Sequence, residues 1–92
     1  MSLTPEEITQ YHEQIPTWDM LENKNISKEC TFPDFKTALE FVNKVGEIAE
    51  RENHHPDIVL GWGKVKVELS THSAGGLTEK DFALARQIDQ LS

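Results

Sequence analysis

Apolar residues recur at helical spacing in three segments of the chain. The first segment covers residues 3–15, and Thr4 is a residue type that favours a helix start. The longest covers residues 33–53, because Pro56 disfavours helical geometry at the residue before it. The last begins after Thr78 and continues to the C-terminus. The apolar stripe expected on the long helix consists of Phe35, Ala38, Leu39, Val42, Val45, Ile48 and Ala49.

Alternating apolar and polar residues predict strands between these helices. Residues 17–32 indicate two strands joined by a turn at residues 22–25, where asparagine tolerates a positive φ. Residues 57–62 and 64–71 predict two more, and the last has Val65, Val67 and Leu69 on one face. The order α-β-β-α-β-β-α predicts an α+β domain, with a four-stranded antiparallel sheet covered on one face by helices.

Three residues carry more specific packing expectations. Gly46 is costly within a helix, so we expect close packing at that position. Trp62 follows Ile58 and Leu60 in the alternation, which favours a core position. Trp18, just before the first strand, suits either the core or the wall of a pocket for a flat ring, and both interpretations stay open.

Length and composition narrow the class of protein. The 92 residues suit one small domain. The hydrophobic core of so short a chain stabilises a monomer only marginally, so association with other copies would add stability. The net charge of −7 argues against direct nucleic-acid binding, which needs clustered basic residues. Cys30 is the single cysteine, so no disulfide framework or cysteine-based zinc site is expected, and it suits a half-buried strand position. We expect no signal peptide and no membrane span, and therefore a reducing, cytoplasmic location.

Three of the four histidines lie between residues 50 and 72. His54 and His55 form a pair that Pro56 closes, and His72 follows a strand. An unperturbed imidazole exchanges protons near neutral pH. Adjacent side chains diverge, so the pair should face different directions. Three imidazoles suit a dehydration, in which an acid protonates a leaving hydroxyl and a base removes a neighbouring proton.

Other interpretations of these residues stay open. The histidine pair and its proline could simply end a helix. The three imidazoles could hold zinc, and Glu50 has helical i, i+4 spacing to His54. That spacing also predicts that Glu50 orients His54. His12 lies apart from the cluster and is expected to be a packing or surface residue.

A multi-part motif extends beyond the histidines. It comprises Glu50, His54, His55, Pro56, Trp62, His72 and Asp81 at fixed spacings. Trp18, the Phe32-x-x-Phe35 entry to the long helix, and residues 69–72 and 76–81 extend it over nearly the whole chain. This pattern resembles the pterin-4a-carbinolamine dehydratases, also known as dimerisation cofactors of a hepatocyte nuclear factor.

The resemblance implies a fold, a reaction and a set of residues. It implies the same order of elements over residues 1–92, as a single domain. Members dehydrate 4a-hydroxytetrahydropterin to quinonoid dihydropterin in tetrahydrobiopterin recycling, with no metal or organic cofactor. The catalytic residues implied are His54, His55 and His72. The further substrate contacts implied are Asn53, Ser70 and Thr71, and the supporting residues are Glu50, Asp81 and Trp18. The family often has aspartate in place of Asn53, and asparagine lacks that carboxylate charge but keeps the ability to form hydrogen bonds.

The resemblance also implies partners. Members assemble as homodimers or homotetramers, and some act as transcriptional coactivators with a homeodomain protein, which is compatible with a nuclear location. A non-catalytic dimerisation cofactor with this fold is therefore the alternative function. The sequence leaves open which pterin is used, which histidine is the acid and which the base, and whether two or four copies assemble.

Overall fold

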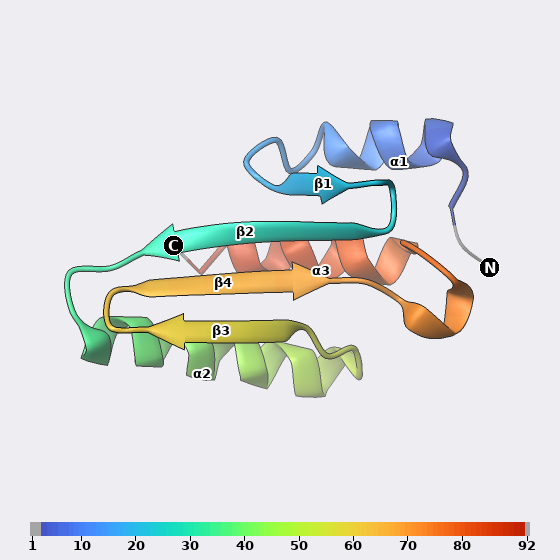
Figure 1. The fold of residues 1–92 in the computed structure, drawn as a ribbon. Coiled ribbons are helices and arrows are strands. Elements are labelled where there is room, and N and C mark those ends of the chain that lie inside the picture. Colours follow the sequence, from blue (N-terminus) through green and yellow to red (C-terminus); the bar gives the residue numbers. More distant parts are fainter. Residues whose placement is uncertain (1–2, 92) are drawn as a thin grey trace.

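The computed structural model describes residues 3–91, and of His72 it describes the backbone alone. The order α-β-β-α-β-β-α is confirmed, with one short 3₁₀ turn added (Figure 1). The elements are α1 (Pro5–His12), β1 (Asp19–Leu21), β2 (Asn25–Thr31), α2 (Phe35–Glu52), β3 (Asp57–Gly61), β4 (Lys64–Leu69), η1 (His72–Ala74) and α3 (Glu79–Asp89).

The four strands form one antiparallel sheet in the order β1-β2-β4-β3. Its inner face is mainly apolar: Val65 is fully buried and lies between Cys30 and Leu60 of the neighbouring strands. Its outer face is polar, and there Glu29 pairs with Lys66. Figure 1 shows α3 behind β2 and β4, with α2 beside β3. The predicted α+β architecture, with helices on one face of the sheet, is confirmed.

The predicted start of α1 is confirmed, but the helix is shorter than expected. The Thr4 hydroxyl accepts from the Glu7 backbone N–H, and the Glu7 carboxylate accepts from the Thr4 N–H. The helix ends at His12, and tighter turns follow it. There His12 Nε2 lies 2.6 Å from the Trp18 carbonyl oxygen, to which it donates. This contact confirms the interpretation of His12 as a packing residue.

The buried face of α2 differs from the predicted stripe. Asp34 begins the helix by accepting from the Thr37 backbone N–H at 2.7 Å. Hydrogen bonds from the side chain and then the backbone of Thr37 lower the pKa of the Asp34 carboxyl. Phe35 and Leu39 are exposed, whereas Phe41 is buried with its ring 5.1 Å from that of Phe32. Two neighbouring apolar rows run along α2, and only one of them faces the sheet. The residues buried on α2 are Ala38, Phe41, Val45, Ile48 and Ala49.

The two tryptophans have opposite environments. Trp62 is 71% exposed, so the expectation of a core position is wrong. The reason is that β3 ends at Gly61, which places Trp62 in the turn before β4. Trp18 is 1% exposed and its indole N–H donates to Asp89 Oδ1 at 2.9 Å. Trp18 is therefore a core residue.

Cys30 has the environment that the sequence predicts. Cys30 is half-buried on β2, as expected, and burial raises the pKa of its thiol. This environment suits a structural thiol.

Within residues 3–91, no helix is long and apolar enough to cross a membrane.

Gly46 lies in an open environment, so the expectation of close packing is wrong. A Cβ built there meets no described atom within 4 Å. Glycine within a helix costs about 1 kcal/mol relative to alanine. We therefore expect Gly46→Ala to raise the free energy of unfolding by about 1 kcal/mol, measured by urea denaturation.

Gly63→Ala is the matched control for this prediction. A Cβ at Gly63 would lie 2.8 Å from the Phe32 carbonyl oxygen, which is closer than real Cβ contacts. The same substitution should therefore destabilise the protein at this position. A lower unfolding free energy for Gly46→Ala would contradict the open environment of Gly46.

Candidate active site

The histidine pair is positioned by the way α2 ends. Asn53 adopts a left-handed conformation with φ of +52°, which asparagine tolerates better than most residues. Its backbone N–H donates to the Glu50 carbonyl at 3.3 Å, and the His54 N–H donates to the Ala49 carbonyl at 3.1 Å. These bonds close the last turn of the helix. As a result the His54 side chain is only 11% exposed, whereas that of His55 is 57% exposed.

His54 is held by Asp81 of α3. Its Nε2 lies 2.5 Å from Asp81 Oδ1, and the Asp81 side chain is 0% exposed. The expected partner, Glu50, instead contacts Nε2 of His55 at the exposed end of α2. The left-handed Asn53 is the reason, because it takes His54 off the helical spacing that would place it one turn from Glu50.

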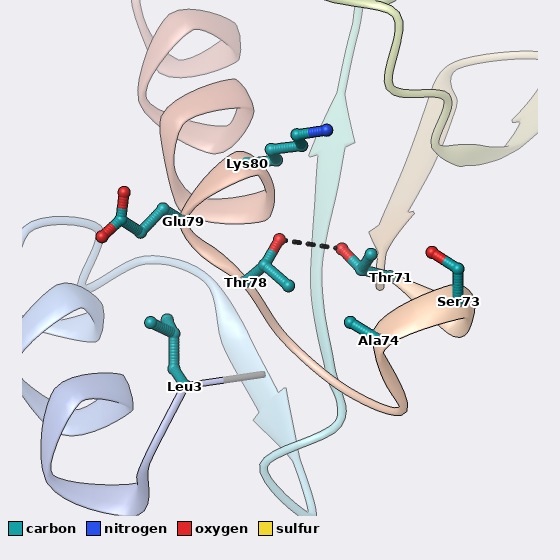
Figure 2. A pocket seen from close by; sticks show the side chains of 7 residues that line it. All are labelled: Leu3, Thr71, Ser73, Ala74, Thr78, Glu79 and Lys80. Carbon is teal, nitrogen blue, oxygen red and sulfur yellow. Dashed lines mark hydrogen bonds between the residues drawn. The ribbon is translucent and has the colours of Figure 1, made fainter. Parts of the chain in front are cut away.

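Asp81 also connects two other segments of the site. Its Oδ2 accepts from the Thr71 hydroxyl at 2.7 Å and from the Thr78 backbone N–H at 2.9 Å. The Thr71 and Thr78 hydroxyl oxygens lie 3.0 Å apart (Figure 2). A single buried carboxylate therefore ties together the end of α2, the loop after β4 and the start of α3.

Two hollows lie on either side of the loop after β4. The larger has a volume of about 420 Å³, and Figure 2 shows the Thr71 and Thr78 hydroxyls meeting at its wall. Its lining consists of Leu3, Thr71, Ser73, Ala74, Thr78, Glu79 and Lys80. The second has a volume of about 330 Å³ and is lined by Lys24, Asn25, Ser70, Thr71, Gly75 and Gly76. Both volumes suit a small molecule, and their hydroxyl and charged groups suit a polar one.

Glu79 adds a negative charge at the edge of the larger hollow. Its hydrogen bond to the Tyr11 hydroxyl raises the pKa of that group. The Tyr11 ring stacks on Phe82 with the centroids 5.3 Å apart. These contacts link α1 to the start of α3 beside the hollow.

The structure brings part of the predicted site together. His54, Thr71 and Asp81 share one hydrogen-bonded network, while Glu50 and His55 form an exposed pair. Asn53 shapes the helix end and is itself exposed.

The remaining predicted residues are placed as follows. Ser70 and Thr71 follow the end of β4 and line one hollow. Trp18 bonds to Asp89, at the far end of α3 from Asp81. The backbone of His72 begins η1 directly after Thr71, and its side chain lies outside the described part of the chain.

Thr78 is the residue that sequence reasoning missed. Its spacing to Asp81 indicated a helix start, and the same spacing could have indicated that its backbone N–H binds the Asp81 carboxylate, which brings its hydroxyl to that of Thr71.

Metal binding finds no support in the described side chains. Among them, no group of three His, Cys, Asp or Glu residues is placed to hold a metal ion. The zinc interpretation therefore has no ligand set in the part of the chain that the structure describes.

Comparisons with known proteins place the chain in a family. The pattern of the family described as pterin 4 alpha carbinolamine dehydratase matches residues 1–91. A relative from Picosynechococcus sp. is 49% identical over 97% of this chain and 96% of its own length. One from Rubrobacter xylanophilus is 43% identical over 97% of this chain and 83% of its own length. Both are provisionally named pterin-4-alpha-carbinolamine dehydratase.

Two solved structures share the fold of this chain. A crystal structure named transcriptional coactivator/pterin dehydratase, from Brucella melitensis, aligns with a TM-score of 0.92 at 30% identity. The match covers 99% of this chain and 98% of the other. A pterin dehydratase-like protein identified as a RuBisCO assembly factor in the alpha-carboxysome aligns with a TM-score of 0.69 over 82% of this chain and 88% of its own. At 22% identity it shows the fold alone. The present chain belongs to the pterin 4 alpha carbinolamine dehydratase family.

Proposed function

We propose that this protein dehydrates a pterin-4a-carbinolamine to the quinonoid dihydropterin, in tetrahydrobiopterin recycling. Family membership supports the reaction class. The observation that carries the proposal for this chain is the His54 imidazole, bound to the buried carboxylate of Asp81. Through Thr71 that carboxylate also reaches a hollow large enough for a small molecule.

The reaction removes water across one carbon–nitrogen bond. A general acid donates a proton to the 4a-hydroxyl as its bond to carbon breaks, and water leaves. A base removes the proton from the adjacent ring nitrogen, whose electron pair forms the new double bond to carbon. Each positioned proton transfer contributes typically on the order of 10²–10⁴-fold. Acid and base are regenerated by exchanging one proton, so the protein needs no consumed reactant.

The proposed catalytic groups are His54, His55 and His72. An imidazole suits both roles because it gains and loses a proton close to neutral pH. Asn53, Ser70 and Thr71 are proposed to contact the pterin through hydrogen bonds. Glu50 and Asp81 support the two imidazoles that they contact.

The test is a direct rate measurement on purified protein. The 4a-hydroxytetrahydropterin is generated in the cuvette, and its ultraviolet absorption is followed with and without protein. We expect decay that accelerates in proportion to protein concentration and that persists after dialysis against a chelator. Decay no faster than in buffer would contradict the proposed function, and activity that chelation abolishes would favour the zinc alternative.

A partner-binding role is the second candidate function. The Brucella melitensis structure carries the name of a transcriptional coactivator, and exposed apolar side chains such as Phe35 and Val59 are available here for contacts. Assembly as a homodimer or homotetramer would use the same kind of surface. Partner binding that survives replacement of His54 but is lost on Phe35→Ser would favour this role.

A further inference from the structure

The buried carboxylate of Asp81 divides its two oxygens between different donors. Oδ1 faces Nε2 of His54 at 2.5 Å, while Oδ2 accepts from the Thr71 hydroxyl and the Thr78 backbone N–H. The two distances on the Oδ2 side, 2.7 Å and 2.9 Å, are those of well-formed hydrogen bonds. Its 0% exposure means that bulk water does not compete for either oxygen.

The direction of each hydrogen bond around this carboxylate follows from which of the groups carries a hydrogen to donate. Thr71 has one hydroxyl hydrogen, which goes to Asp81, so the Thr78 hydroxyl donates to Thr71 across 3.0 Å. An ionised carboxylate accepts hydrogen bonds and donates none. The Asp81 carboxylate accepts on both of its oxygens, so the hydrogen between it and His54 lies on Nε2 of the imidazole, which donates to Oδ1.

We propose that Asp81 is a positioning residue that keeps the His54 proton on Nε2 and so makes Nδ1 the nitrogen that exchanges a proton with the substrate. The inference rests on the proposed function for its catalytic consequence. The tautomer itself is independent of which reaction takes place. The exposed pair of Glu50 and His55 lacks this constraint, because water competes for both partners.

Asp81→Asn tests the inference with little change in shape. Asparagine offers one oxygen, which can keep accepting from Thr71 and from the Thr78 N–H that begins α3. Its amide nitrogen then faces His54 and can only donate, so Nε2 must accept and the proton moves to Nδ1. An orienting carboxylate changed to its amide has this effect on the histidine of serine proteases, at a cost of about 10⁴ in kcat.

The first readout is the tautomer, from ¹⁵N NMR of protein labelled at histidine, with the His54 signals assigned by comparison with His54→Gln. We expect Nε2 to carry the hydrogen in the unsubstituted protein and Nδ1 to carry it in Asp81→Asn. The second readout is kinetic. We expect kcat for carbinolamine dehydration to fall on the order of 10²–10⁴-fold with KM changed only a few-fold.

Asp89→Asn is the matched control, since it makes the same change at a second hydrogen-bonded carboxylate of α3, which is only partly buried. Asp89 accepts from Trp18 and Lys28, outside the site. This variant should keep the His54 tautomer and kcat of the unsubstituted protein.

The possible outcomes separate this inference from the proposed function. A hydrogen on Nδ1 of His54 in the unsubstituted protein, or a tautomer unchanged by Asp81→Asn, overturns the inference. The tautomer of the unsubstituted protein can be measured even if Asp81→Asn does not fold, so the inference can be contradicted without that variant. A tautomer that switches in a protein with no dehydratase activity supports the positioning role and contradicts the proposed function alone.

Discussion

Replacing His54 with alanine is expected to lower the rate of carbinolamine dehydration on the order of 10²–10⁴-fold. Of the two predicted catalytic imidazoles whose side chains the structure describes, that of His54 is bound to a buried carboxylate, so its loss removes both a proton-transfer group and the partner of Asp81. The measurement is kcat from the decay of carbinolamine absorption, on protein whose far-ultraviolet circular dichroism matches that of the unsubstituted chain.

His54→Gln provides the control for folding. Removing the imidazole leaves Asp81 Oδ1 without its buried donor, and an unsatisfied buried group costs roughly 1–3 kcal/mol. The glutamine amide can donate to Asp81 but cannot exchange a proton at neutral pH. This variant should therefore be more stable than His54→Ala and equally inactive. Activity close to that of the unsubstituted protein in both variants would remove His54 from the mechanism.

Trp18→Ala is expected to destabilise the protein by about 3–5 kcal/mol, the usual cost of emptying a large aromatic site in a core. Trp18 is among the largest fully buried side chains, and its loss also removes the N–H donor to Asp89. Domains of this kind are stable by only about 5–15 kcal/mol. We therefore expect the urea midpoint to fall by a large part of its value.

Trp62→Ala is the matched comparison, because it deletes the same side chain where that side chain is exposed. The free energy of unfolding should change by no more than about 0.5 kcal/mol. Trp18→Phe should keep most of the dehydratase activity at temperatures where the protein is folded, since Trp18 bonds to Asp89 and not to the site. Loss of activity in folded Trp18→Phe would restore the interpretation of Trp18 as a pocket residue.

The elements of the fold could be predicted because their signals are local. Thr4 and Glu7 carry both halves of a capping interaction within one turn, and the structure forms both bonds. Val65, Val67 and Leu69 alternate with polar residues, and all three are fully buried. Each pattern lies within a few residues, so the rest of the chain is not needed to interpret it.

The partner of His54 could not be predicted in this way, because it comes from a different part of the chain. Helical spacing favoured Glu50, but the left-handed Asn53 breaks that spacing and Asp81 approaches from α3. The two tryptophans show the same limit. Both continue apolar patterns in the sequence, and only the packing of distant elements buries Trp18 and leaves Trp62 in solvent.

The position of Leu3 has a practical consequence for protein expression. Its backbone N–H donates to the Leu77 carbonyl at 2.9 Å, and its side chain lines the larger hollow (Figure 2). A purification tag fused ahead of this residue would join the chain beside the mouth of that hollow. In Figure 1 the C-terminal end of α3 lies on the other side of the molecule from the N-terminus. Assays of the proposed reaction should therefore use a C-terminal tag, or protein from which an N-terminal tag has been cleaved.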